Sequence, residues 1–158
     1  LHLSIRRQRQ MCIRDRATIN NLEELVPLFD AYRQFYDKKS DVKAAEKFLE
    51  ARIVNDESVI FLAYNKDEKA VGFVQLFPSF SSTRMKRFWI LNDLFVSPEF
   101  RGQGFSRELI EEAKNLCRKT DACAMLLETS VTNDIGNSLY PSAGFQLRDD
   151  ANFYEWEV

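Results

Sequence analysis

The chain of 158 residues is long enough for one domain with its own core, and 45% hydrophobic and 29% charged residues are typical of globular proteins. No apolar run approaches the roughly 18 residues that a membrane span needs, so we expect no membrane-spanning role. The formal net charge of −2 gives no general attraction to nucleic acid or anionic lipid, and we expect neither as a partner.

Two residue counts restrict the chemistry further. The three cysteines lack the spacing of a metal site, and the apolar surroundings of Cys117 and Cys123 favour reduced thiols in a cytoplasmic protein. The only histidine is His2. A Ser-His-Asp triad, a Cys-His pair and a His-ligated zinc site are therefore not expected, and we predict no metal.

The N-terminal segment is rich in arginine. It has no apolar central region, so it is not a secretory signal, and a nucleic-acid-binding arm is one hypothesis. The segment through about Asp15 also resembles translated library-adapter sequence, which favours an extension foreign to the fold. We therefore predict that residues 1–15 are a non-native or disordered extension and that residues 16–158 form one domain. The arginines are Arg6, Arg7, Arg9, Arg14 and Arg16.

Two helices are expected first. Apolar residues recur at helical spacing behind Asn20 and Asn21, which are good N-cap residues, and Pro27 should kink this helix or move its start. A second helix can be capped by Ser40 or Asp41. The apolar positions of the first helix are Leu22, Leu25, Phe29, Tyr32 and Tyr36, and those of the second are Val42, Ala45, Phe48, Leu49 and Ile53.

Strand patterns follow the helices. Ser58–Tyr64 and Ala70–Phe77 are short, rich in Val, Ile and Phe, and joined by the polar turn Asn65–Lys69, so they predict a hairpin. Arg87–Val96 is a third apolar run that can extend the hairpin.

The last part of the chain alternates helix and strand patterns. We predict an amphipathic helix over Phe105–Cys117, a buried strand over Ala122–Glu128, a short helix over Asp134–Pro141 that ends at Gly144, and one or two strands over Phe145–Val158. This order predicts an α/β (α+β) protein. Its mixed, mostly antiparallel central sheet should be flanked by helices on both faces.

The loop between the third strand and the amphipathic helix carries two glycines. A glycine-rich turn that enters a helix leaves backbone N–H groups pointing one way and can cradle an anion, and side chains at Gly102 and Gly104 would block it. The alternative is a tight strand-to-helix turn without a ligand. A dinucleotide fingerprint would need glycine where Arg107 stands, and a Walker loop would need Lys-Ser/Thr where Phe105 stands.

The loop resembles the Arg/Gln-x-x-Gly-x-Gly/Ala motif of GNAT acetyltransferases through Arg101, Gly104 and Ser106, where the small Ser106 replaces the usual last residue, Gly or Ala. The resemblance implies a GNAT fold and acetyl-CoA as cosubstrate. It places the acetyl and pantetheine groups on the preceding strand and the pyrophosphate on the loop. The cofactor-binding residues that it implies are Leu94, Phe95, Val96, Arg101, Gly102, Gln103, Gly104, Phe105 and Ser106.

A second segment, residues 133–145, is similar to the family's Asn-x-x-Ala-x-x-Leu-Tyr-x-x-x-Gly-Phe motif, with Gly136 in place of alanine. The resemblance makes Asn133 and Tyr140 cofactor contacts. A thiolate leaving group must be protonated, and a phenol, ordinarily of pKa about 10, suits a thiol of about 8–9. Tyr140 is therefore the predicted general acid, the alternative being a half-buried core tyrosine.

The attacking amine must lose a proton, usually to a carboxylate. Asp93 and Glu128 are the candidates for base or amine anchor, because both lie in otherwise apolar runs. Sheet alternation puts Asn92 and Asp93 on opposite faces, and a bulge would reverse which of them faces the cleft. Tyr32 and Tyr36 wall the acceptor pocket in one interpretation and pack in the core in the other.

These signals predict an N-acetyltransferase in which a primary amine attacks acetyl-CoA directly in a ternary complex. The acceptor would be a small cationic amine, an amino acid derivative or a lysine side chain. The chain also resembles the histone-acetyltransferase-like and diamine-acetyltransferase-like subgroup. The rival hypothesis is a non-catalytic acyl-CoA-binding domain, and a homodimer contact is suggested by family analogy alone.

Overall fold

The computed structural model describes residues 12, 13 and 15–158. The described chain divides into two compact units, one that ends at Leu127 and one over Glu128–Val158. Most of the predicted extension over residues 1–15 lies outside the described residues. Its residues Cys12 and Ile13 form a short strand that pairs with a strand of the larger unit. In the described part of the chain, no helix is both long and apolar enough to cross a membrane.

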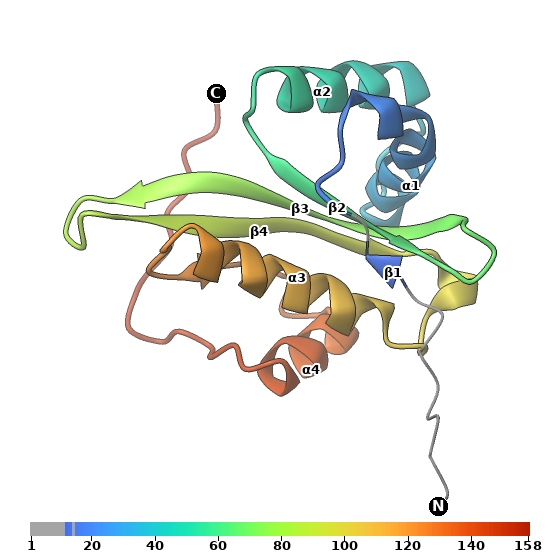
Figure 1. Ribbon diagram of the computed structural model, residues 1–158. Coiled ribbons are helices and arrows are strands. Elements are labelled where there is room, and N and C mark those ends of the chain that lie inside the picture. The colour runs from blue at the N-terminus through green and yellow to red at the C-terminus, as the bar shows by residue number, and fades with distance from the viewer. Residues whose placement is uncertain (1–11, 14) are drawn as a thin grey trace, which may run out of the picture. The chain divides into compact units, whose positions relative to one another are not determined.

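The larger unit is built on a mixed sheet, as the sequence predicts (Figure 1). Its strands lie in the order β1-β2-β3-β4-β5. The first three pairings are antiparallel, and only β4 and β5 run parallel. The strands are β1 (Cys12–Ile13), β2 (Val59–Tyr64), β3 (Ala70–Ser81), β4 (Lys86–Val96) and β5 (Met125–Leu126).

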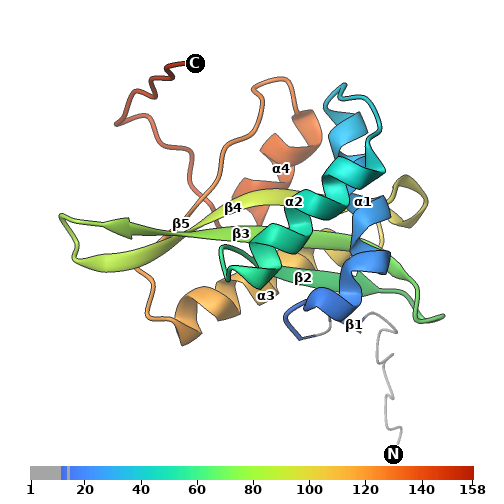
Figure 2. The same cartoon turned by 90° about the horizontal axis from the view of Figure 1, so that it is seen from above.

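Helices cover both faces of this sheet, which confirms the predicted fold class. Helices α1 (Leu22–Phe35) and α2 (Val42–Val54) lie on one face, and α3 (Phe105–Lys119) lies on the other (Figures 1 and 2). Because both faces are covered, every residue of β2 is buried. This explains its continuous apolar sequence, which lacks the alternation of a one-sided strand.

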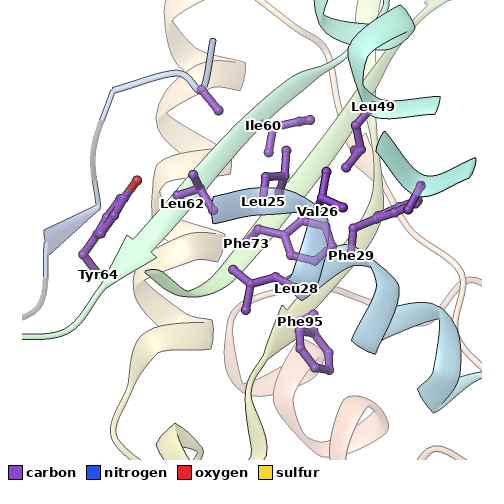
Figure 3. Close-up of a cluster of buried hydrophobic side chains, with 12 residues drawn as sticks. Leu25, Val26, Leu28, Phe29, Leu49, Ile60, Leu62, Tyr64, Phe73 and Phe95 are labelled. Atoms are coloured by element: carbon purple, nitrogen blue, oxygen red, sulfur yellow. The ribbon is translucent and has the colours of Figure 1, made fainter. Parts of the chain in front are cut away.

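The core under α1 and α2 is a cluster of aliphatic and aromatic side chains (Figure 3). Leu25 of α1, Leu49 of α2 and Phe73 of β3 are completely buried in it. Full burial of such a side chain stabilises the fold by about 1.5–3 kcal/mol. On the opposite face, α3 buries Phe105, Leu109, Ile110 and Ala113, which share one side of the helix.

The helix starts differ in part from the sequence-based expectation. The side chain of Asp41 caps α2 and accepts a hydrogen bond from the N–H of Ala44 at 3.0 Å, as predicted. A 3-10 turn, η1 (Ile19–Asn21), precedes α1, and Thr18 caps this turn. Helix α1 neither ends nor restarts at Pro27 but runs through it.

The smaller unit contains α4 (Asp134–Ser142). Gly144 follows the end of this helix in the left-handed conformation, with φ of 92°. The predicted strands over Phe145–Val158 are wrong, since these residues form neither helix nor strand. The side chains of Tyr154 and Trp156 are exposed. Alternation alone does not make a strand, because a strand needs a neighbouring strand and a surface to cover its apolar face.

A buried carboxylate fixes the connection between α1 and α2. Asp30 is only 4% exposed, and it accepts hydrogen bonds from the Ser40 hydroxyl at 2.6 Å and the Asp41 N–H at 2.8 Å. Gln34 donates to it as well at 3.0 Å, and Arg33 lies 3.7 Å away. The hydrogen bond from Ser40, followed by that from Asp41, lowers the pKa of Asp30 from its ordinary value.

We therefore expect Asp30→Ala to lower the free energy of unfolding by about 2 kcal/mol at neutral pH, because it leaves buried donors unpaired. A carboxyl group with a depressed folded-state pKa stabilises the fold above its unfolded pKa, and this contribution is lost as the pH falls through the folded value. The difference from wild type should therefore shrink in acid. Urea unfolding at several pH values measures it, with the exposed Asp67→Ala as control. An equal loss at every pH would contradict the ionic role.

Candidate active site

Strand β4 leads into the glycine loop through a 3-10 turn, η2 (Pro98–Phe100). Gly102 and Gly104 have φ of 75° and 96°, in the left-handed region that favours glycine. Gly104 is also the N-cap of α3. The two predicted glycines are thus required by the backbone that turns from the strand into the helix.

The loop is open to a ligand. A Cβ atom built on Gly102 would meet no other atom within 4 Å. The first N–H groups of a helix have no partner inside it. In α3 the hydrogen-bond ladder begins where the Glu108 N–H donates to the Gly104 carbonyl at 3.2 Å. The N–H groups of Phe105 and Ser106 are therefore available to an anion at the positive end of the helix dipole.

The side chains of the loop residues differ in their exposure and in their contacts. The Phe105 side chain is 3% exposed and packs edge-on against Phe100, with ring centroids 6.5 Å apart, so only its backbone can serve a ligand. Ser106 is half-buried and Gln103 is exposed. Arg101 donates from Nε to the Val96 carbonyl at 2.9 Å.

Arg101 also reaches the end of α1. Its guanidinium carbon lies 5.7 Å from the ring centroid of Phe35 and 5.8 Å from that of Phe95. Cation–π contacts of this kind stabilise by about 0.5–1 kcal/mol where they are exposed. The structure therefore gives Arg101 a bracing role between the end of β4, the loop and α1.

The strand before the loop has one unoccupied edge within the larger unit. Leu94, Phe95 and Val96 pair with β3 on one side. On the other side, β5 pairs with β4 only at Trp89 and Ile90. Among the described residues of this unit, no strand accompanies the Leu94–Val96 edge, and an extended chain could add to it.

A bulge in β4 decides which polar side chain turns inward. Gln75 of β3 pairs with Asp93, whereas the next residue, Leu76, pairs with Leu91. Asn92 is therefore the extra residue, and it is exposed, whereas Asp93 is 4% exposed. Of the two residues that the sequence leaves open, the bulge buries Asp93.

Asp93 is held by three polar side chains. Gln75 donates to its Oδ2 at 2.6 Å, and Asn92 donates to its Oδ1 at 3.0 Å. Burial raises the pKa of Asp93 above its ordinary value, and hydrogen bonds from Gln75, Tyr32 and Asn92 oppose this in part. A carboxyl group of raised pKa is a better proton acceptor near neutral pH.

Aromatic residues at the C-terminal end of α1 lie beside this part of the sheet. The Tyr32 ring packs edge-to-face with Phe73 and Phe95, with centroids 5.9 and 6.3 Å away, and its hydroxyl oxygen lies 3.4 Å from the Asn92 carbonyl oxygen. Tyr36 is 45% exposed and stacks edge-on with Tyr32 at 5.2 Å. The structure thus brings Tyr32, Tyr36, Asn92 and Asp93 together.

The second motif forms its own local structure in the smaller unit. Asn133 caps α4 and accepts a hydrogen bond from the Gly136 N–H at 3.1 Å. A Cβ at Gly136 would come 2.6 Å from Asn133 Nδ2 and 3.2 Å from Tyr140 Cε2, so a larger residue there would require these side chains to shift. Tyr140 is half-buried and edge-on to Phe145 at 5.7 Å, whereas Glu128 is exposed.

Comparison with known proteins identifies the family. A model described as the acetyltransferase (GNAT) family matches residues 22–145. The chain belongs to the GNAT acetyltransferase family. It is 41% identical over 140 residues to the uncharacterized N-acetyltransferase YhfO of Bacillus subtilis, covering 89% of this chain and 92% of that protein.

Solved structures agree with this assignment. A crystal structure of a probable acetyltransferase superposes with a TM-score of 0.87 at 39% identity and covers 95% of this chain and 98% of its own. An aminoglycoside N-acetyltransferase in complex with CoA shares the fold, with a TM-score of 0.79 at 22% identity, covering 98% of this chain and 99% of its own. The protein is therefore an enzyme, an acyltransferase of the GNAT N-acetyltransferase type.

The sequence alone does not single out two residues near the site of this GNAT enzyme. A Cβ at Gly72 would come 2.6 Å from the Phe95 carbonyl oxygen, so β3 can approach the end of β4 only with glycine there. Gln75 is fully buried against Asp93. Glycine inside an apolar strand signals close backbone approach, and a lone glutamine in such a strand signals a buried polar partner.

The raised pKa of Asp93 implies a cost in stability. A group whose folded-state pKa is raised stabilises the fold below its unfolded pKa, and this contribution is lost as the pH rises through the folded value. The side chain introduced by Asp93→Asn carries no charge at any pH. We expect the variant to melt at the wild-type temperature in acid and above it at pH about 8, by several degrees for each kcal/mol.

Thermal unfolding followed by circular dichroism across this pH range measures the effect. Asp67→Asn, at an exposed aspartate of the β2–β3 turn, is the control and should show no such trend. A variant that is less stable than wild type at high pH would contradict the burial cost of the ionised carboxylate.

Proposed function

We propose that this GNAT enzyme transfers the acetyl group of acetyl-CoA to a cationic primary amine by direct attack in a ternary complex. The observation that carries the proposal is the glycine loop itself: Gly102 is open on its Cβ side, Gly104 caps α3, and the loop continues from the strand that holds the buried Asp93. An anion site and a proton acceptor on one strand and its loop are what this reaction needs.

The loop residues fit the diphosphate of CoA. The N–H groups at Gly102, Gly104 and Ser106 would bind its oxygens, since the backbone of Gly102 is open on its Cβ side. The free edge at Leu94–Val96 would accept the pantetheine arm as an added strand, through backbone hydrogen bonds. An aminoglycoside N-acetyltransferase with the same fold is in complex with CoA, which supports CoA as the ligand proposed here.

The chemistry follows from these groups. The acceptor ammonium gives a proton to Asp93, directly or through water, and its freed lone pair attacks the carbonyl carbon of the thioester. A C–N bond forms, the C–S bond breaks, and the CoA thiolate takes a proton from the proposed acid Tyr140. Neither motif contains a cysteine that could form an acyl-enzyme intermediate.

The acceptor is proposed to be cationic because of what surrounds Asp93. A carboxylate and the neighbouring faces of Tyr32 and Tyr36 attract an ammonium group, and Asn92 is exposed beside them. A polyamine, an amino acid derivative and a lysine side chain all carry this group. Because the chain has both a base candidate and Tyr140, nothing favours the rival hypothesis of a non-catalytic acyl-CoA-binding domain.

The cradle is tested by Gly102→Val. A β-branched residue cannot easily adopt the φ of 75° at this position, and its side chain would enter the space proposed for the diphosphate. Calorimetry should show CoA affinity reduced at least about tenfold, or 1.4 kcal/mol. Glu68→Val places the same residue type at φ of 59° in the β2–β3 turn and should leave affinity unchanged. Equal affinities for both variants would contradict the cradle.

The acid is tested by Tyr140→Phe. Removing a general acid should lower kcat by about 10²–10⁴-fold with little change in KM for acetyl-CoA, as measured by thiol release with a panel of amines. Tyr154→Phe changes a tyrosine that is 91% exposed, and it serves as control. Wild-type rates in Tyr140→Phe would remove this residue from the mechanism.

A further inference from the structure

Gln75 is a buried polar residue that the chemistry above leaves unexplained. It lies in the middle of β3 with none of its surface exposed, between the buried residues Val74 and Leu76. Across the bulge it faces Asp93 directly. A buried amide destabilises the fold unless it is hydrogen-bonded, so its presence in an apolar strand calls for a partner.

Only half of the Gln75 amide has that partner. Nε2 donates to Asp93 Oδ2 at 2.6 Å. The carbonyl oxygen Oε1 is buried and accepts no hydrogen bond from any described residue. A purely structural pair would be no less stable with apolar side chains of the same shape at both positions, because that would remove the unpaired oxygen and the buried carboxylate together. The unused acceptor therefore points to a second state of the pair.

The second state follows from the proton that Asp93 receives. As a carboxylate, Asp93 only accepts hydrogen bonds, which suits Nε2 of Gln75. Once it carries a proton on the oxygen that faces Gln75, it becomes a donor, and two donors would face each other. A half-turn of the Gln75 amide about its last side-chain torsion exchanges Nε2 for Oε1 and restores a hydrogen bond.

We propose that Gln75 is the positioning residue of the Asp93 base: its N–H holds the ionised carboxylate, and its Oε1 accepts from the carboxylic acid formed when the acceptor amine is deprotonated. This inference rests on the proposed function of Asp93. The step is a proton transfer in which the ammonium loses the proton that Asp93 gains. The amide rotation keeps Asp93 in one place through both states.

The pKa of Asp93 changes in the direction that this role needs. Burial raises it, and the hydrogen bond from Gln75 is the largest of the contributions that lower it, ahead of those from Tyr32 and Asn92. Tyr32 of α1 is the titratable side chain that faces the carboxyl group, and no charged residue in the described part of the chain contributes to the change. Gln75 thus keeps Asp93 ionised at a pH where it can accept the amine proton.

The test replaces the amide and follows the proton. Gln75→Met keeps length and volume but removes both hydrogen-bonding atoms. We expect the acid limb of kcat/KM, and the titration of the Asp93 carboxyl carbon followed by NMR, to move to higher pH together. On the acid side of the limb, kcat/KM should fall about tenfold for each pH unit that the limb moves, and it should recover at alkaline pH.

A second variant and a control make the test independent of folding defects. Gln75→Glu places a second carboxyl group against Asp93, so the two would share a proton and the limb should again move to higher pH. Ser58→Ala removes the other buried oxygen without a partner in the described chain, and it should leave limb and titration unchanged. A pH-independent loss in both Gln75 variants, with an unchanged NMR titration, would overturn the proposal.

Failure of this inference is distinct from failure of the proposed function. If Asp93→Asn loses activity while the Gln75 variants keep the wild-type limb and titration, Gln75 has no positioning role and the base assignment stands. If Asp93→Asn keeps full activity, Asp93 is not the base and the inference falls with it.

Discussion

The pairing of β3 with β4 is the constraint on which the candidate site depends. Gly72 permits close approach at one end of the pairing, and the bulge at Asn92 lies within it. Between these points the strand turns Asp93 inward and then leads into the glycine loop. Core packing of α1 on one face and α3 on the other holds the pairing in place, so the loop amides and the buried carboxylate share one rigid support.

Two buried aspartates show how the surroundings of a carboxylate set the direction of its pKa. Asp30 accepts hydrogen bonds from the chain that follows α1, which stabilise its charge and lower its pKa. Asp93 has donors as well, but burial outweighs them and its pKa rises. The first arrangement stabilises the fold. The second costs stability and leaves a group able to take up a proton, as functional sites often do.

The sequence predicts most of the framework because helix and strand periodicity are local properties. It also predicts the unusual backbone conformation of Gly102 and Gly104, since a left-handed turn before a helix needs glycine. The inward-facing carboxylate stays open at that level, because a bulge depends on the pairing of two strands. Gly72 is missed for the same reason. The prediction of strands at the C-terminal end is wrong, since the alternating residues near Trp156 pair with no strand in the described chain.

The proposed function depends on backbone amides at the start of α3 that hold the diphosphate of acetyl-CoA. The most direct measurement is a titration of ¹⁵N-labelled protein with CoA, followed by amide NMR. We expect the largest shifts for the N–H groups from Gly102 to Ser106, with smaller shifts along Leu94–Val96. Saturation with CoA that leaves these resonances in place, or moves only resonances elsewhere, would contradict it.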